Sequence, residues 1–185
     1  MNPPDYSKCT PDELWKFVSW HLSKSGIGTV LVGGAVASIY SRGSYISGDL
    51  DFVKITYVSK KTLTEVLEQI GFKPTGGRHY EHPECKHLFL EFVPPPVAIG
   101  DDYFIKPVES IVSGQKIKIL SPTDCIKDRL ASYIHFRAQE CLDQAILVAK
   151  NQPFEMKSIE KWCNGEGPAG KEAFRLFMER TEKLI

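Results

Sequence analysis

Signals that would place a protein in a membrane, outside the cell or on nucleic acid are missing from this sequence. No apolar run approaches the roughly 20 residues that a membrane-spanning helix requires. The opening stretch MNPPDYSKCTPDELW has neither the basic segment nor the apolar core of a secretion signal. The formal net charge is zero, from 23 basic and 23 acidic residues, so no strong positive field favours DNA or long RNA. The zero net charge is still compatible with binding the compact end of a tRNA, because a local basic patch is enough for that.

Signals for disulfide pairing are missing as well. The cysteines contain no Cys-x-x-Cys pair and their number, 5, is odd. Such usage is typical of reduced thiols and not of a disulfide framework. Together with the absence of a leader or a membrane span, it leads us to expect a cytoplasmic protein. The residues concerned are Cys9, Cys85, Cys125, Cys141 and Cys163.

What the sequence has is enough apolar material for one packed domain, or one domain with a helical appendage. Hydrophobic residues make up 42% and aromatic residues 11% of its 185 positions. Cap residues and apolar periodicity predict helices and strands in a mixed core, followed by helices alone, which is an α+β arrangement. The expected helices span 10–25, 35–41, 59–70, 121–134, 137–150, 155–163 and 170–184. The expected strands span 29–32, 49–57, 72–75, 78–82, 87–93, 103–106 and 115–120.

The most informative stretch is residues 31–53, LVGGAVASIYSRGSYISGDLDFV. A glycine pair between a strand and a helix offers free backbone N–H groups to an anion. Strand alternation then places Asp49 and Asp51 on one face, about 7 Å apart. Two such carboxylates can share a divalent metal ion. The stretch therefore indicates a phosphate-binding turn beside a metal platform, as a magnesium nucleotide would need.

A third carboxylate lies inside the apolar strand sequence LFLEFV. Glu91 is costly there unless it is paired or binds a metal. We therefore expect Glu91 to bind a metal ion or to act as a base. The alternative is an outward-facing residue on a half-exposed strand.

This arrangement resembles the nucleotidyltransferase superfamily, whose signature is an apolar residue, Gly-Gly or Gly-Ser, a short helix, and then Asp-apolar-Asp. The matching positions are Val32-Gly33-Gly34 and Asp49-Leu50-Asp51. Ser47 and Arg42 also suit the small bacterial branch, which includes toxin enzymes of abortive-infection and toxin–antitoxin systems. The resemblance covers roughly residues 28–150 and is strongest in the opening motif.

The resemblance implies a mixed β-sheet flanked by helices, with a catalytic core at 1–120 and a helical region at 121–185 packed on it. It implies transfer of an NMP from an NTP to an acceptor hydroxyl on a protein, a small molecule or a tRNA end, with Mg²⁺ or Mn²⁺ bound by Asp49, Asp51 and Glu91. A cognate protein partner is also implied. The alternative is an inactive nucleotide-binding or partner-binding module of the same fold.

The sequence departs from the family pattern at two places. Position 34 is Gly instead of Ser, so nucleotide binding must use the backbone of Gly33 and Gly34 and basic side chains. The candidates are Arg42, Lys127 and Arg129, supported by Ser47. In the helical region, Lys127 fits the family, and Asp143 keeps an acidic spacing, but Gln139 stands where an Arg is usual.

A histidine-rich segment, HYEHPECKH, offers a separate metal hypothesis. His79, His82, Cys85 and His87 are zinc-ligand types at spacings of three, three and two residues. The segment lies in an expected hairpin, so its imidazoles are more often simply packed or solvated. We favour His79 or His87 as a lining of the substrate pocket over a zinc site.

Overall fold

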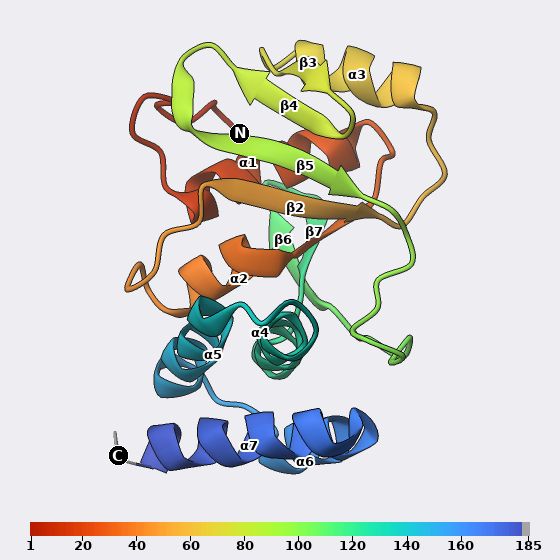
Figure 1. The fold of residues 1–185 in the computed structure, drawn as a ribbon. Helices are drawn as coiled ribbons and strands as arrows, with labels where there is room; N and C mark the ends of the chain where they lie inside the picture. Colours follow the sequence, from red (N-terminus) through yellow and green to blue (C-terminus); the bar gives the residue numbers. More distant parts are fainter. Residues whose placement is uncertain (183–185) are drawn as a thin grey trace.

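The computed structural model describes residues 1–182 and contains one mixed sheet with helices around it. Within those residues the sheet has seven strands in the order β3-β4-β5-β2-β1-β7-β6 (Figure 1). The strands are β1 Thr29–Val32, β2 Asp49–Lys54, β3 Lys73–Gly76, β4 His79–His82, β5 Cys85–Val93, β6 Val108–Val112 and β7 Gln115–Ile119. The α+β class with a helical C-terminal part is confirmed.

Local capping chemistry sets the helix starts. The helices are α1 Pro11–Lys24, α2 Gly33–Tyr40, α3 Lys60–Glu68, α4 Pro122–Phe136, α5 Gln139–Asn151, α6 Met156–Gly165 and α7 Gly167–Glu182. Thr10 and Glu13 form the expected capping box at the start of α1. Ser59 and Ser121 cap α3 and α4 through their hydroxyls. The last two positions of the helix expected at 170–184 lie outside the described residues.

The three central strands bring distant acidic residues into register. β2 runs antiparallel to β1 and parallel to β5, while β1 runs parallel to β7. In this register Asp51 lies opposite Val32 on one side and Glu91 on the other. The alternate residues Leu50, Phe52 and Leu90 are completely buried. One face of the sheet thus builds the core and the other carries the acids.

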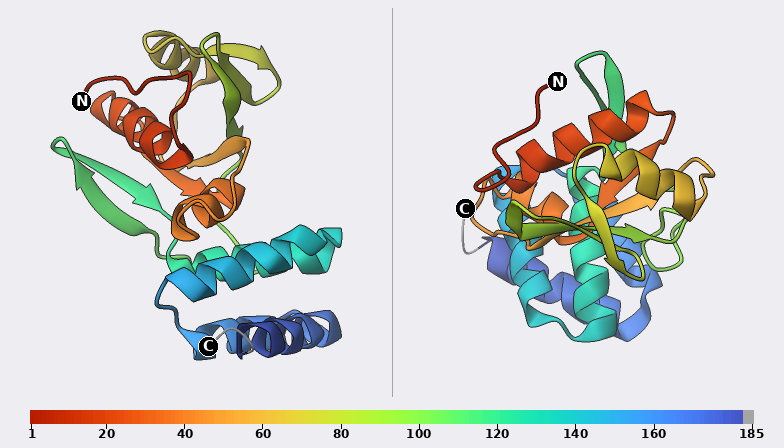
Figure 2. Two further views of the ribbon diagram at one scale, coloured as in Figure 1. Left: turned by 90° about the vertical axis from the view of Figure 1, so that its left-hand side faces the viewer. Right: turned by 90° about the horizontal axis from the view of Figure 1, so that it is seen from above.

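The helices after the sheet form two layers beneath it. The helix α2 packs on α4 and α5, which in turn pack on α6 and α7. Figure 1 shows these layers below β2, and Figure 2 shows the β6–β7 ribbon extending away from them. The first layer therefore reaches the sheet at α2, next to the glycine turn. No helix among the described residues is long and apolar enough to cross a membrane.

Two strand predictions were wrong. Residues 103–106 form no strand, because the Asp102 side chain accepts a hydrogen bond from the Phe104 backbone N–H (2.9 Å) and turns the chain. The edge strand is instead β6, which pairs with β7 across a turn at Ser113 and Gly114, both with positive φ. The strand expected at 49–57 ends at Lys54.

Candidate active site

The glycine turn and the second aspartate fit directly against each other. Gly33 begins α2 with φ +74°, a conformation that side chains disfavour. A Cβ added there would overlap the Oδ2 atom of Asp51. The close approach of strand β2 to this turn therefore requires glycine, and it places the Asp51 carboxylate at the N-terminus of α2.

That helix N-terminus is uncapped by any side chain. Its N-cap residue is Val32, which has no side-chain oxygen to accept from the first backbone N–H groups. Free N–H groups at a helix start attract anions. A phosphate beside the glycine turn would satisfy them.

Three carboxylates lie on the same face of β2 and β5, although their oxygens are not gathered within 4.8 Å of one another. Asp49 and Asp51 are two residues apart, and Glu91 is the direct neighbour of Asp51 on the adjacent strand. Neighbouring strands lie about 4.8 Å apart, so the two side chains share the same patch. All three are partly buried, which limits how well water can screen their repulsion.

The electrostatics of this patch favour a bound cation. Burial, followed by the negative charges of Asp49 and Glu91, raises the pKa of Asp51 from 3.8 to about 7. Divalent cations such as Mg²⁺ prefer a few carboxylate oxygens completed by water and phosphate. The donor type fits such an ion: Asp49 and Asp51 would hold it, with Glu91 beside them, once their side chains move closer together than the arrangement seen here.

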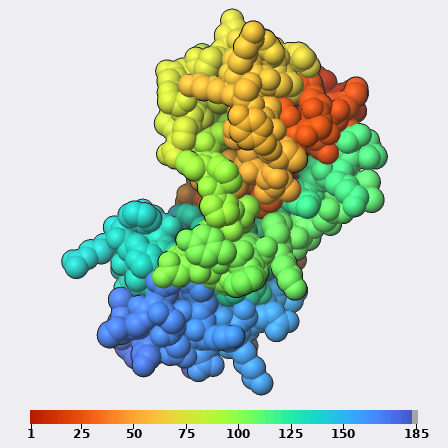
Figure 3. Space-filling model, turned by 90° about the vertical axis from the view of Figure 1, so that its right-hand side faces the viewer, coloured from red at the N-terminus to blue at the C-terminus, as the bar shows by residue number. Residues whose placement is uncertain are grey.

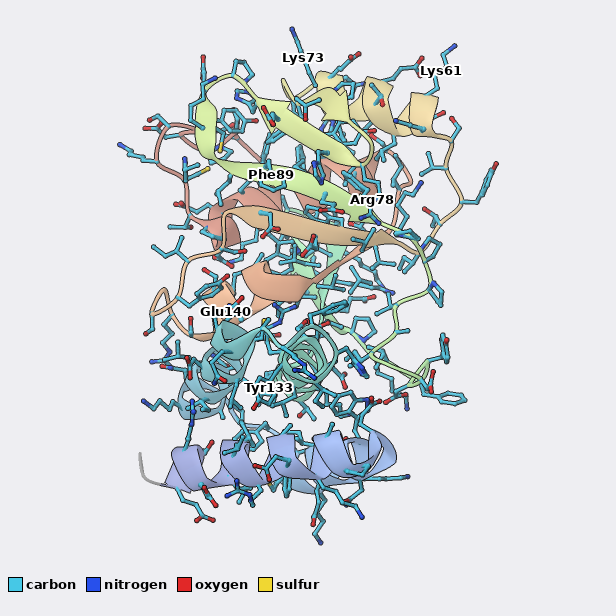
Figure 4. The ribbon with its side chains drawn as sticks, viewed as in Figure 1. Lys61, Lys73, Arg78, Phe89, Tyr133 and Glu140 are labelled. Atoms are coloured by element: carbon cyan, nitrogen blue, oxygen red, sulfur yellow. The ribbon has the colours of Figure 1, made fainter. Side chains whose placement is uncertain are left out.

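Glu91 also has positive partners of its own. Its carboxylate pairs with Arg78 at 2.6 Å and with the His79 imidazole at 3.1 Å. Arg78 lies at the start of the β4–β5 hairpin, on the same side as Phe89 (Figure 4). Since the Glu91 side chain is only 15% exposed, these partners orient it.

A hydroxyl supports the first aspartate. Ser47 is buried and donates a 2.6 Å hydrogen bond to Oδ1 of Asp49. A Cβ built on Gly34 would lie 2.9 Å from the same Ser47 hydroxyl. A Cβ atom at position 34 would therefore be in close contact with the Ser47 hydroxyl. This explains how the site accommodates glycine at 34.

An acidic and a basic residue of α4, Asp128 and Arg129, also lie near the site, and Asp128 was not predicted from the sequence. Asp128 and Arg129 both act electrostatically on Asp51, Arg129 lowering its pKa and Asp128 raising it. Asp128 pairs with Arg129 at 2.6 Å, and Arg129 also donates to the Gln144 side chain (3.3 Å). No local motif signals Asp128, since only the packing of α4 brings it near β2.

The remaining predicted nucleotide-binding residues lie elsewhere. Arg42 is exposed, and its side chain lines a cavity beside the N-terminal segment. Lys127 is buried and pairs with Asp124 (3.2 Å) and Asp102 (3.8 Å). Asp143 is exposed on α5 and pairs with Arg180 at 2.8 Å. None of these contacts joins the carboxylate patch, so the nucleotide role of the three residues stays a prediction.

The histidine-rich segment divides into separate environments. His79 joins Glu91, while His82 is buried and stacks on Tyr6 with ring centroids 3.8 Å apart. Cys85 and His87 lie together, but with Cys9 as their third neighbour. The structure therefore does not gather the four residues around one ion.

A cavity of about 670 Å³ lies at the C-terminal end of β2, and none of the three acids lines it. Its lining includes Val30, which pairs with Val53, two positions beyond Asp51. The floor is mostly apolar, and Lys54 and Lys118 supply positive charge. Figure 3 views this side of the molecule, where residues 54–58 and the segment 95–107 form the walls.

Comparisons with known proteins agree on the fold. No family model matches the sequence, and no curated protein matches it. A nucleotidyltransferase-like antigenic protein from Paracoccidioides brasiliensis superposes with a TM-score of 0.64 at 15% identity, over 96% of this chain and 91% of its own. The antibiotic-resistance factor ANT(2'')-Ia superposes with a TM-score of 0.50 at 13% identity, over 92% of each chain. The chain therefore has a nucleotidyltransferase-like fold, as its motif predicted.

Proposed function

We propose that this chain is a metal-dependent nucleotidyltransferase that moves an NMP from an NTP to an acceptor hydroxyl. The observation that carries the proposal is the placement of Asp49, Asp51 and Glu91 on one strand face, with Asp51 against the uncapped N-terminus of α2. The free N–H groups of a helix N-terminus suit a phosphate, and neighbouring carboxylates suit a divalent metal ion.

Each residue then has a task in the transfer. Asp49 and Asp51 hold the ion, and Ser47 orients Asp49. Bound Mg²⁺ or Mn²⁺ supplies charge stabilisation at the phosphate and lowers the pKa of the acceptor hydroxyl. The N–H groups of the glycine turn bind phosphate oxygens. The acceptor oxygen bonds to the α-phosphorus, the bond to the leaving pyrophosphate breaks, and Glu91 accepts the hydroxyl proton.

The cavity at the end of β2, three residues along the same strand from Asp51, guides the choice of acceptor. ANT(2'')-Ia is an antibiotic-resistance factor, but the cavity here carries Lys54 and Lys118 in an apolar lining. Positive side chains repel a polycationic acceptor and attract phosphate or carboxylate groups. We therefore favour a small neutral or acidic acceptor, or a protein side chain.

Calorimetric titration with each NTP and Mn²⁺ tests the binding half of the proposal. Wild type is expected to bind NTP only with metal, and Asp49→Asn/Asp51→Asn is expected to lose this binding. Glu109→Gln is the matched control, because Glu109 is exposed on β6 and pairs with Lys116. Metal-dependent binding that survives the double substitution would contradict the site assignment.

Transfer of label from each of the four NTPs, assayed in cell lysate with added protein, tests turnover. The alternative, an inactive nucleotide-binding module, is favoured by one observation: Glu91 already pairs with Arg78 and His79. Labelled bands that need Asp49 and Asp51 support the enzyme. Identical bands with wild type and double variant, alongside intact nucleotide binding, support the module.

A further inference from the structure

Two thiols and an imidazole from distant parts of the chain converge away from the acidic patch. One potential ligand atom each from Cys9, Cys85 and His87 lies within 4.8 Å of the other two. Cys9 belongs to the segment before α1, while Cys85 and His87 begin strand β5. Among residues 1–182, no other three histidine, cysteine or acidic side chains bring ligand atoms within 4.8 Å of one another.

We propose that Cys9, Cys85 and His87 form a binding site for a thiophilic transition-metal ion, Zn²⁺ in the first instance. Cysteine and histidine together are the ligands that zinc prefers. With Zn–S bonds of about 2.3 Å and Zn–N bonds of about 2.0 Å, ligand atoms around a tetrahedral ion lie roughly 3.5–3.8 Å apart. With its ligand atoms within 4.8 Å of one another, the cluster needs each pair to close by about 1.3 Å at most.

The imidazole is already oriented by a neighbour in the cluster. Nε2 of His87 lies 2.8 Å from the backbone carbonyl oxygen of Cys9. Metal-binding histidines are usually held in this way by a carbonyl or carboxylate. One residue, Cys9, thus supplies a thiol to the cluster and fixes the direction of its imidazole.

The surrounding contacts hold the N-terminal segment against the β4–β5 hairpin. Tyr6 stacks on His82, and its hydroxyl donates to the carbonyl of Ile70 (3.2 Å). The two strand ligands therefore face a segment that is fixed without any metal (Figure 1). An ion here would join that segment to the sheet, so binding adds to folding stability.

The cluster borders a cavity on the side of His87. Both thiols are buried, whereas His87 is exposed. Cys9 and His87 also line a cavity of about 590 Å³ bounded by the N-terminal segment and α2. A water from this cavity can complete a tetrahedral shell, and the ion can enter by the same route.

The cluster is separate from the proposed catalytic metal site. His87 precedes Glu91 by four residues on β5, or about 13 Å along the strand. The two sites share no ligand, and their donor types differ: sulfur and nitrogen here, oxygen alone there. The inference therefore does not rest on the proposed nucleotidyl transfer.

Cobalt titration distinguishes the two sites directly. Reduced, metal-stripped protein is titrated with Co²⁺ in the Asp49→Asn/Asp51→Asn background and in wild type. We expect one ion per chain to produce a thiolate-to-cobalt charge-transfer band in both proteins, because oxygen ligands give none. Zn²⁺ is expected to displace the cobalt and bleach the band.

Substitutions then assign the ligands. Cys9→Ser and Cys85→Ser are each expected to abolish the charge-transfer band, and His87→Gln to weaken cobalt affinity at least tenfold. Cys163→Ala is the matched control, because this buried cysteine lies on α6; it should keep the band. Zn²⁺ should raise the Tm of wild type and of Cys163→Ala but not of Cys9→Ser. Absence of the band in folded wild type, or its persistence in Cys9→Ser and Cys85→Ser, overturns the proposal.

Discussion

Gly33 and Asp51 occupy adjoining space, so that no side chain at position 33 is compatible with the carboxylate at position 51. The turn at Gly33 has φ +74°, and an added Cβ would overlap Oδ2 of Asp51. Two requirements therefore meet at one glycine: a left-handed backbone and room for an acid at the start of α2. The glycine turn and the Asp51 carboxylate are therefore one packed unit.

Gly33→Ala is expected to damage both stability and ligand binding. The left-handed conformation alone costs about 1–2 kcal/mol for alanine, and displacement of Asp51 should weaken metal-dependent NTP binding by more than tenfold. Gly165→Ala is the control, since an added Cβ there meets nothing within 4 Å and its φ is not positive. Chemical denaturation and calorimetry measure the two effects. Unchanged NTP affinity in Gly33→Ala would contradict the coupling of turn and carboxylate.

The raised pKa of Asp51 predicts a pH-dependent stability for the metal-free protein. Burial and the nearby acids raise this pKa from 3.8 to about 7, so the folded state favours the protonated form. The contribution of Asp51 to stability is therefore greatest below about pH 4, falls as pH rises to 7, and levels off above. The loss is at most about 4 kcal/mol, at roughly 1.4 kcal/mol per pKa unit.

Denaturation of metal-free wild type and Asp51→Asn from pH 4 to 8 checks this slope. Asp51→Asn is expected to flatten it and to be the more stable protein at pH 8. Saturating Mg²⁺ should stabilise wild type at pH 8 and leave Asp51→Asn unaffected. A variant less stable than wild type at pH 8 without metal would contradict the assignment of strain to this carboxylate.

Local signals in the sequence were sufficient for most elements and for the central motif. The capping box at Thr10 and the serine caps at Ser59 and Ser121 act within one helical turn, so short patterns reveal them. Alternation along β2 likewise assigned Asp49 and Asp51 to one face. The pairing of Asp51 with Glu91 needed more, namely the parallel register of β2 and β5.

What sequence reasoning missed depends on tertiary packing. Asp128 reaches Asp51 because α4 packs beside α2, and no pattern within α4 records that contact. Cys9 joins Cys85 and His87 across more than 70 residues of sequence, so a search for closely spaced ligands selected His79 and His82 instead. The Ser47 hydroxyl near Gly34 is also visible only in three dimensions.

Ser47→Ala is expected to weaken metal binding while leaving the fold intact. It removes the 2.6 Å hydrogen bond to Asp49, and loss of such supporting bonds typically lowers metal affinity about 10–100-fold. Ser44→Ala is the control, because Ser44 is exposed in the same loop. Mn²⁺ titration in the presence of NTP measures the effect.

A second substitution tests whether a hydroxyl at this place supports Asp49 regardless of which residue carries it. Gly34→Ser in the Ser47→Ala background restores a hydroxyl near the same place, since Cβ of residue 34 would lie 2.9 Å from the Ser47 oxygen. Partial recovery of Mn²⁺ affinity is expected. Equal affinity in wild type and Ser47→Ala would show that Asp49 needs no support.

Glu91→Gln should separate turnover from binding. Asp49 and Asp51 still hold the ion in this variant, so NTP affinity should change by less than about tenfold, whereas removal of the proton acceptor typically costs about 10²–10⁴-fold in rate. Arg78→Met is the companion variant, because Arg78 pairs with Glu91 from an exposed position. Arg78→Met should change the free energy of unfolding by less than about 1 kcal/mol. Full transfer activity in Glu91→Gln would exclude Glu91 as the base.

Substitution of Lys127 tests whether this lysine, which matches the family pattern, binds nucleotide or stabilises the packing of the helices. Its side chain is 7% exposed, and its ammonium pairs with Asp124, which is also buried, and with Asp102. Removing one partner of a buried ion pair costs about 3–5 kcal/mol, since the other charge is left unpaired. Lys127→Met should therefore lower the free energy of unfolding by a few kcal/mol, whereas Lys161→Met, an exposed control on α6, should not.

The nucleotide role of Lys127 is measured in the same variants at a temperature where both are folded. A structural role predicts NTP affinity within about twofold of Lys161→Met, while loss of a phosphate contact would cost about tenfold or more, since charged hydrogen bonds contribute roughly 1.5–3 kcal/mol. Because the ion pairs of Lys127 are with Asp102 and Asp124 and not with the carboxylate patch, we expect the structural result. A tenfold loss of affinity in folded Lys127→Met would instead require Lys127 to exchange Asp102 and Asp124 for the nucleotide on binding.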